Sequence, residues 1–186
     1  MLYITVIIIL ILLLWYNNFG ETDLTFVKGH DEDFHLVRNL SNKHMAADVM
    51  AEIKERLEKL IIHLKKTYPN NKDIYRLKNR YNEDNIRETS LTDNGTSYSV
   101  DKGKEISICI RDKQTERIHS INLLMFVSIH EMAHIMSKTY GHNDEFLKNF
   151  IFLLKESVKI GIYNNIDYSR NKKEYCGIIV DSNPLF

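Results

Sequence analysis

Residues 121–142 read INLLMFVSIHEMAHIMSKTYGH, the most informative stretch of the chain. Most of its first sixteen residues are apolar, which predicts a largely buried helix. On a helix, residues four apart lie on the same face, so His130 and His134 can aim their imidazoles at one metal ion. Glu131 follows the first histidine directly. From this position a carboxylate can act as a general base without binding the metal.

Two histidines and a glutamate are costly on a buried helix unless they have partners. A shared metal ion would satisfy them, and the spacing is typical of zinc sites. The alternative is a pair of ordinary core histidines held by a tight hydrogen-bond network. Ligand type alone does not separate zinc from other divalent cations, so zinc is predicted from the motif.

A zinc site of this kind needs a third ligand, for which His142 is the preferred candidate. A continuous helix would carry His142 about 12 Å along the axis from His134, too far away to share an ion. Gly141 removes the difficulty, because glycine readily adopts the left-handed conformation that turns the chain. Glu156 is the alternative ligand: it lies 22 residues beyond His134, on a second predicted helix.

The motif and the residues after it resemble the SprT-like and WLM-type zinc metallopeptidases. Those proteins have a third histidine shortly after the motif, often followed by an acidic residue and an aromatic one, as in Gly141-His142-Asn143-Asp144-Glu145-Phe146 here. The tail, with Tyr175-Cys176-Gly177 and Asn183-Pro184-Leu185, is similar to that of uncharacterised membrane-anchored members from large DNA viruses. The resemblance covers residues 97–186. It implies a protease with Glu131 as catalytic base and three zinc ligands: His130, His134 and His142.

The remaining patterns predict an α+β fold, a zincin-like domain over residues 42–186 with a small, mostly antiparallel sheet. A helix is expected over 42–67, either packed on the domain or forming a coiled coil, and a shorter one over 72–81. The helix after the motif is expected to begin at Asn143 or Asp144, both of which are good N-caps. The apolar stripes of the first and last of these helices are Ala46, Met50, Ile53, Leu57, Leu60 and Leu64, and Phe146, Phe150, Leu153, Leu154 and Val158.

Two strands are predicted before the motif, over Ser97–Val100 and Glu105–Arg111. In the second, Ile106, Ile108 and Ile110 alternate with polar residues or cysteine, which predicts one buried face. In zinc peptidases of this kind the strand before the motif helix often lies at a sheet edge. We therefore expect residues 105–111 to bind an extended substrate as an added strand.

The N-terminal run Leu2 to Tyr16 is apolar and uncharged. Fifteen helical residues span about 22 Å, short of the ~30 Å hydrocarbon core, and Trp15 and Tyr16 are typical of a membrane interface. A cleaved signal peptide and a buried helix are the alternatives, but no basic region precedes the run and no small-residue cleavage site follows it. We predict a transmembrane anchor over 1–20 and a juxtamembrane segment over 21–41. The protein is therefore expected to be a single-pass protein of a host or virion membrane. Its orientation across that membrane is left open.

Composition restricts the partners. Twenty-five basic and 25 acidic residues cancel, so no global field attracts nucleic acid. Cys109 and Cys176 allow one disulfide without requiring it. Alternatively, Cys176 is a fourth ligand that closes the site and makes the metal structural.

The sequence therefore predicts a membrane-anchored zinc endopeptidase that hydrolyses protein or peptide substrates. A catalytically inactive, zinc-stabilised membrane scaffold or assembly protein is the main alternative. A metal-free interaction module built on the 42–67 helix is another. An open coordination position would favour catalysis, whereas four protein ligands would favour a structural metal. The oligomeric state is left open.

Overall fold

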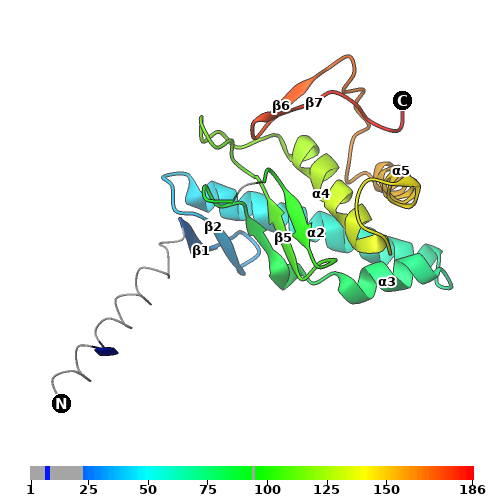
Figure 1. Cartoon of the computed structure of the whole chain (residues 1–186), viewed down its shortest axis with the longest axis horizontal. Helices are drawn as coiled ribbons and strands as arrows, with labels where there is room; N and C mark the ends of the chain where they lie inside the picture. Colours follow the sequence, from blue (N-terminus) through cyan, green and yellow to red (C-terminus); the bar gives the residue numbers. More distant parts are fainter. Residues whose placement is uncertain (1–6, 9–22, 94) are drawn as a thin grey trace.

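The motif helix, α4 (Ile121–Met136), is surrounded by the other elements of an α+β fold (Figure 1). The computed structural model describes residues 7–8, 23–93 and 95–186. In order, the remaining elements are β1 (Leu24–Lys28), β2 (Phe34–Arg38), α2 (Lys43–Thr67), α3 (Lys72–Arg80), the 3-10 turn η1 (Glu83–Asn85), β3 (Ile86–Glu88), β4 (Tyr98–Val100), β5 (Glu105–Ile108), α5 (Asp144–Lys159), β6 (Lys173–Tyr175) and β7 (Ile178–Val180).

The predicted helices α2, α3 and α5 are present with nearly the predicted bounds. All six residues of the predicted α2 stripe are buried, because α2 packs against the β1–β2 hairpin and α4. This packing explains the stripe without a coiled coil. Asn143 caps α5 as predicted, with its side-chain oxygen accepting from the Phe146 amide at 3.1 Å. Val158 is an exception to the α5 stripe, since it is 37% exposed.

The central sheet has the strand order β3-β5-β4. β4 and β5 form the predicted antiparallel hairpin, in which Ser99 pairs with Ile106, and β3 runs parallel to β5. β5 is therefore the middle strand. The prediction that residues 105–111 form an edge strand is wrong, and so is the prediction of a single buried face. Residues 106–112 are all buried because helices cover one side while polar partners fill the other.

One of those polar partnerships is a buried ion pair. The Arg111 guanidinium donates to both Glu88 carboxylate oxygens, at 2.8 and 2.6 Å, and to the Arg38 carbonyl at 2.6 Å. Glu88 also accepts from the Arg38 amide at 2.7 Å. These bonds tie β2, β3 and the end of β5 together, so the hairpin that precedes α2 is part of the folded domain.

That hairpin, β1–β2, lies within the segment that the sequence placed between the anchor and the domain. Its strands pair antiparallel, with Phe26 opposite Leu36, and the inward-facing Val27 and Val37 are buried. Asp23 extends the connection: its carboxylate accepts from the Leu91 amide at 3.0 Å. Residues 23–38 thus pack on the domain, where no helical or strand periodicity had pointed to them.

The transmembrane prediction has to be corrected. Across the described ranges 7–8, 23–93 and 95–186, no helix is both long and apolar enough to cross a membrane. Nearly all of the predicted span over 1–20 lies outside the described residues. The fold class is therefore α+β without a demonstrated membrane helix, and a single-pass membrane location is not supported.

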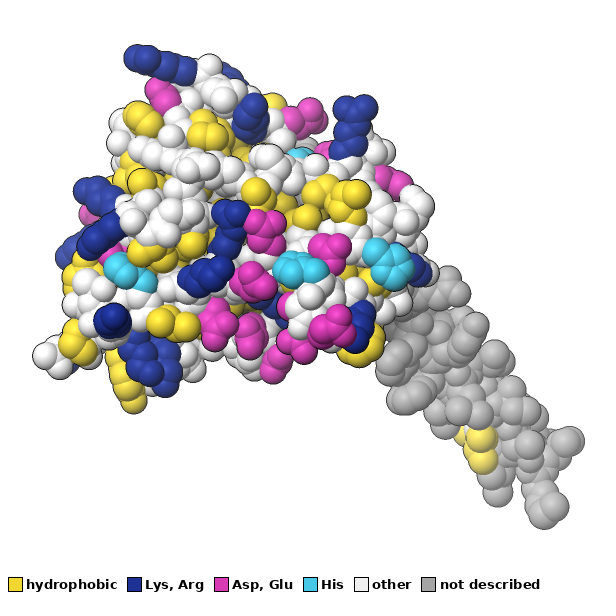
Figure 2. All heavy atoms as spheres, turned by 180° about the vertical axis from the view of Figure 1, so that it is seen from behind, with side chains coloured by type: hydrophobic (Ala, Val, Ile, Leu, Met, Phe, Trp, Pro, Cys, Tyr) yellow, Lys and Arg dark blue, Asp and Glu magenta, His cyan; other side chains and the backbone are white. Residues whose placement is uncertain are grey.

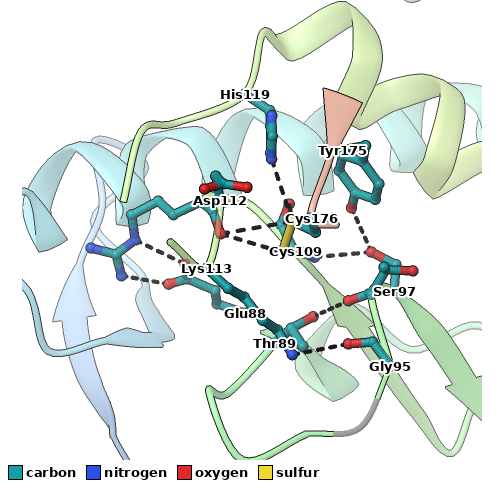
Figure 3. Close-up of a disulfide and its surroundings, with 12 residues drawn as sticks. Glu88, Thr89, Gly95, Ser97, Cys109, Asp112, Lys113, His119, Tyr175 and Cys176 are labelled. Carbon is teal, nitrogen blue, oxygen red and sulfur yellow. Dashed lines mark hydrogen bonds and ion pairs between the residues drawn. A yellow bond between two sulfur atoms is a disulfide. The ribbon is translucent and has the colours of Figure 1, made fainter. Parts of the chain in front are cut away.

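A disulfide joins Cys109, just after β5, to Cys176 in the β6–β7 turn, with 6.5 Å between the two Cα atoms (Figure 3). The sequence left this pairing open. Next to it, the Tyr175 hydroxyl and the Ser97 hydroxyl are hydrogen-bonded at 2.6 Å, and Ser97 accepts from the Cys109 amide at 2.9 Å. The disulfide and these bonds attach the C-terminal hairpin to the chain just after β5 and just before β4.

The balanced net charge hides an uneven distribution. On the face seen in Figure 2, acidic side chains gather near histidines. Burial lowers the pKa of the Lys54 ammonium, while carboxylates around it act in the opposite direction. The acidic residues that line the hollow next to Lys54 are Asp31, Asp33, Glu55, Glu58, Glu83 and Asp84.

Candidate metal centre

The C-terminal half of α4 presents the two motif histidines, and a short loop brings in the third. α4 ends at Met136, where the Ser137 amide and hydroxyl both bond the Ala133 carbonyl, at 3.0 and 2.7 Å. The helix thus stops before Gly141, which instead turns the loop, as its positive φ of 82° shows. The chain reverses there, and His142 lies directly before the N-cap of α5.

The three histidine rings converge. The Nε2 atoms of His130 and His134 are 3.2 Å apart, those of His134 and His142 3.1 Å, and those of His142 and His130 3.0 Å. Three nitrogens bound to one tetrahedral zinc ion at about 2.0–2.1 Å lie about 3.3 Å from one another. The triangle therefore fits one small cation, and it is the one group of at least three possible metal ligands among the described residues.

Aromatic packing holds the rings in this arrangement. The Phe146 ring stacks on His134, with 4.3 Å between centroids and 29° between planes, and meets the edges of His130 and His142 at 4.8 and 4.7 Å. Burial, with smaller contributions from neighbouring histidines and, at His134, Lys102, lowers the pKa of His130 to about 3 and that of His134 to about 4. Both rings are therefore neutral at pH 7, the form that binds metals.

Glu131 lies beside this cluster on the same helix and is only 4% exposed. Burial raises the pKa of its carboxyl to about 7, while a hydrogen bond with the Ser99 side chain acts in the opposite direction. Its carboxyl can therefore exchange a proton near neutral pH, as a general base must. Ser99 lies on β4, so this strand meets the site directly.

Two charged residues that the sequence analysis did not select hold the loop that carries His142. The Glu145 carboxylate accepts from the Thr139 hydroxyl at 2.6 Å and from the amides of Lys138 and Thr139, both at 3.0 Å, and these hydrogen bonds lower its pKa to about 2. Lys102, in the β4–β5 turn, donates to the His134 carbonyl at 3.1 Å and to the Thr139 carbonyl. The role of Glu145 could have been suspected only from the presence of an acidic residue after the third histidine. Nothing in the sequence indicates the role of Lys102.

The cluster opens into a hollow of about 320 Å³. β4 forms one wall, and among the described strands it pairs only with β5, so its other side is a sheet edge. The strand available for pairing with a peptide is thus β4 and not residues 105–111. The hollow is lined by Ser97, Tyr98, Ser99, Lys102, His130, Glu131, His134, Tyr140, Gly141 and His142.

The alternative ligands are engaged elsewhere. Glu156 accepts from the Tyr68 hydroxyl at 2.9 Å and pairs with His63 at 2.5 Å, which joins α5 to α2. Cys176 is in the disulfide (Figure 3). The structure thus brings together His130, His134 and His142 with Glu131 beside them, in an open hollow that β4 borders.

The fold and this cluster define an α+β protein with a three-histidine centre, and sequence comparison finds its relatives among viral proteins. The chain is 35% identical over 184 residues to "Uncharacterized protein R325" of Acanthamoeba polyphaga mimivirus, covering 96% of this chain and 93% of the mimivirus protein. The chain belongs to the family of that mimivirus protein.

Shorter similarities link it to proteins of two further viruses. "Uncharacterized protein 136R" of Invertebrate iridescent virus 6 is 31% identical over 97 residues, which cover 51% of this chain and 53% of that protein. "Uncharacterized protein 042R" of Invertebrate iridescent virus 3 is 33% identical over 88 residues, which cover 47% and 54%. No protein-family model and no solved structure matches the chain.

Proposed function

We propose that the protein is a zinc-dependent endopeptidase, as the resemblance to SprT-like and WLM-type peptidases implies. The observation that carries this proposal is the convergence of three imidazoles beside a buried carboxyl in one open hollow. Three protein ligands with an open side are typical of catalytic zinc, whereas a structural site is closed by a fourth. This geometry favours an enzyme over a zinc-stabilised scaffold.

Each residue then has a defined task. His130, His134 and His142 would hold zinc, which supplies Lewis acidity toward the scissile carbonyl and the attacking water. Glu131 would remove a proton from that water and return it to the leaving amine. Its raised pKa suits both steps, since the group accepts and releases a proton near pH 7.

The edge strand β4 supports substrate binding at the same place. An extended peptide paired with β4 would pass in front of Glu131, because Ser99 of β4 and Glu131 line the same hollow. Main-chain pairing of this kind binds a peptide largely independently of its sequence. The substrate class that fits is therefore an extended segment of a polypeptide.

The test combines metal analysis with hydrolysis. The purified full-length protein should contain about one zinc ion per chain, cleave an unfolded test protein such as reduced casein, and lose this activity to a chelator. Glu131→Gln should keep the zinc and lose nearly all hydrolysis. Glu58→Gln, the same change at an exposed position of α2, is the matched control. Hydrolysis that survives in Glu131→Gln, or protein that binds no zinc, would contradict the proposal.

A further inference from the structure

A second hollow, of about 500 Å³, lies beside the metal centre between α5 and the C-terminal stretch that includes β7. In Figure 1 the β6–β7 hairpin lies above α4, and the chain runs from it towards α5. Three aromatic rings form the floor of this groove: Phe126 of α4, and Phe146 and Phe150 of α5. The rings of Phe126 and Phe150 are 5.3 Å apart between centroids, and both residues are buried.

The groove and the catalytic hollow share a wall. His130 lines both of them. Its ring meets Phe146 and Phe150 at centroid distances of 4.8 and 5.2 Å. A polypeptide lying across the three histidines would therefore place one side chain at the mouth of this groove. That side chain belongs to a residue next to the bond under attack.

The far wall of the groove is held in place. Asn183, 5% exposed, donates to the Tyr163 hydroxyl at 3.1 Å and to the Ile166 carbonyl at 2.9 Å, and it accepts from the Leu185 amide at 3.1 Å. At the other end of this stretch, the hairpin is fastened by the Cys176 disulfide. The groove is thus preformed and does not have to assemble around a ligand.

The lining of the groove selects apolar groups. Ile179 is 57% exposed at its rim, together with the exposed Ile178, Leu147 and Phe186. Among the described lining residues, Asp181 is the one Asp, Glu, Lys or Arg, and most of the others are apolar. A large apolar side chain would cover this surface, whereas a charged one would lose its hydration without gaining a partner.

We infer that this groove is the specificity pocket of the site, and that it takes a large apolar side chain of the substrate next to the scissile bond. The inference rests on the proposed peptidase function. Leucine, isoleucine, methionine and phenylalanine are mostly buried in folded proteins. The substrates are therefore segments of unfolded or partly unfolded polypeptides that expose such residues.

Cleavage-site sequencing tests the preference. The zinc-loaded full-length protein is incubated with a library of peptides from digested cell protein, and the new termini are sequenced. Large apolar residues should be enriched at one of the two positions that flank the cleaved bond. Equal use of all residues there, or a preference for charged ones, would overturn the inference.

Variants connect this preference to the groove. Ile179→Asp should lower the ratio of kcat/KM for a leucine peptide to that for its alanine counterpart by about 10–100-fold, the factor expected for burial of one large side chain. Ile62→Asp, on α2, is the matched control, because Ile62 is equally exposed, at 58%. An unchanged ratio in Ile179→Asp would refute the role of the groove. If Ile179→Asp changes the oligomeric state but not this kcat/KM ratio, the groove is a self-association surface and the inference is likewise refuted.

Peptide binding separates this inference from the function on which it rests. Glu131→Gln should bind the leucine peptide at least tenfold more tightly than the alanine peptide, as measured by fluorescence anisotropy, and the added Ile179→Asp should remove the difference. Equal binding of the two peptides would refute the pocket. Selective binding without any hydrolysis by the wild-type protein would refute the peptidase function and leave the pocket standing.

Discussion

Removal of the disulfide should destabilise the fold substantially. The bond joins residues 67 positions apart, Cys109 and Cys176. A cross-link that closes a loop of this length lowers the entropy of the unfolded chain by an amount equivalent to about 4 kcal/mol. The Cys109→Ser/Cys176→Ser variant should therefore lose about 4 kcal/mol of unfolding free energy. The hydrogen bond between Tyr175 and Ser97 would persist in the folded state, so the native structure itself should change little.

Urea unfolding of the full-length protein, followed by circular dichroism, measures this loss. With a slope of about 2 kcal/mol per molar urea, the midpoint should fall by about 2 M. Dithiothreitol should shift the wild-type midpoint in the same direction and leave the double variant unaffected. If the variant unfolds at the wild-type midpoint, or if the reductant acts equally on both proteins, the disulfide does not constrain the chain as argued.

The remaining predictions concern the buried charges and the loop. Burial raises the pKa of Glu131 from 4.5 to about 7, so this carboxyl stabilises the fold at low pH, where it is protonated. In chelator-treated protein, the unfolding free energy of the wild type should fall by roughly 3 kcal/mol relative to that of Glu131→Gln as the pH rises from 4.5 to above 7. Chemical denaturation across that range would show this, and a pH-independent difference would contradict it. Glu145→Gln should weaken zinc binding about tenfold at unchanged stoichiometry, because the loop that carries His142 loses the hydrogen bonds that hold it. Competition with a chromophoric chelator measures the zinc affinity, and a wild-type affinity in the variant would exclude this role of Glu145. Arg111→Met should cost about 3–5 kcal/mol by leaving the buried Glu88 carboxylate without its charged partner, and adding Glu88→Met should restore most of this. Two equally destabilised variants in thermal unfolding would speak against the pairing argument.

Local patterns predicted the helices well. The α2 stripe from Ala46 to Leu64 is buried as its spacing indicates, and the N-cap of α5 is Asn143 as expected. Helical spacing decides which residues share a face, and that face is buried wherever the helix packs. The exposed Val158 shows the limit of this reasoning, because the residues buried in the last turn of α5 are Glu156 and Ser157 instead.

Predictions that required a position in the sheet were less successful. The alternation in residues 105–111 correctly indicated a strand, but it placed that strand at an edge with one buried face. β5 is central because β3, a short strand with little periodicity, joins it on the side away from β4. Strand order depends on the path of the whole chain, which no local pattern records.

Local sequence is enough to specify the motif helix, and with it the common face of His130 and His134, because four-residue spacing on a helix leaves no other arrangement. It takes the packing of the whole chain to fold His142 back onto that face, to turn Glu156 away to His63, and to select the strand that borders the site. The disulfide and the aromatic groove beside His130 were also decided at this level. These features join residues distant in the chain, and their contacts depend on how the elements pack, whereas a helix is specified by its own residues.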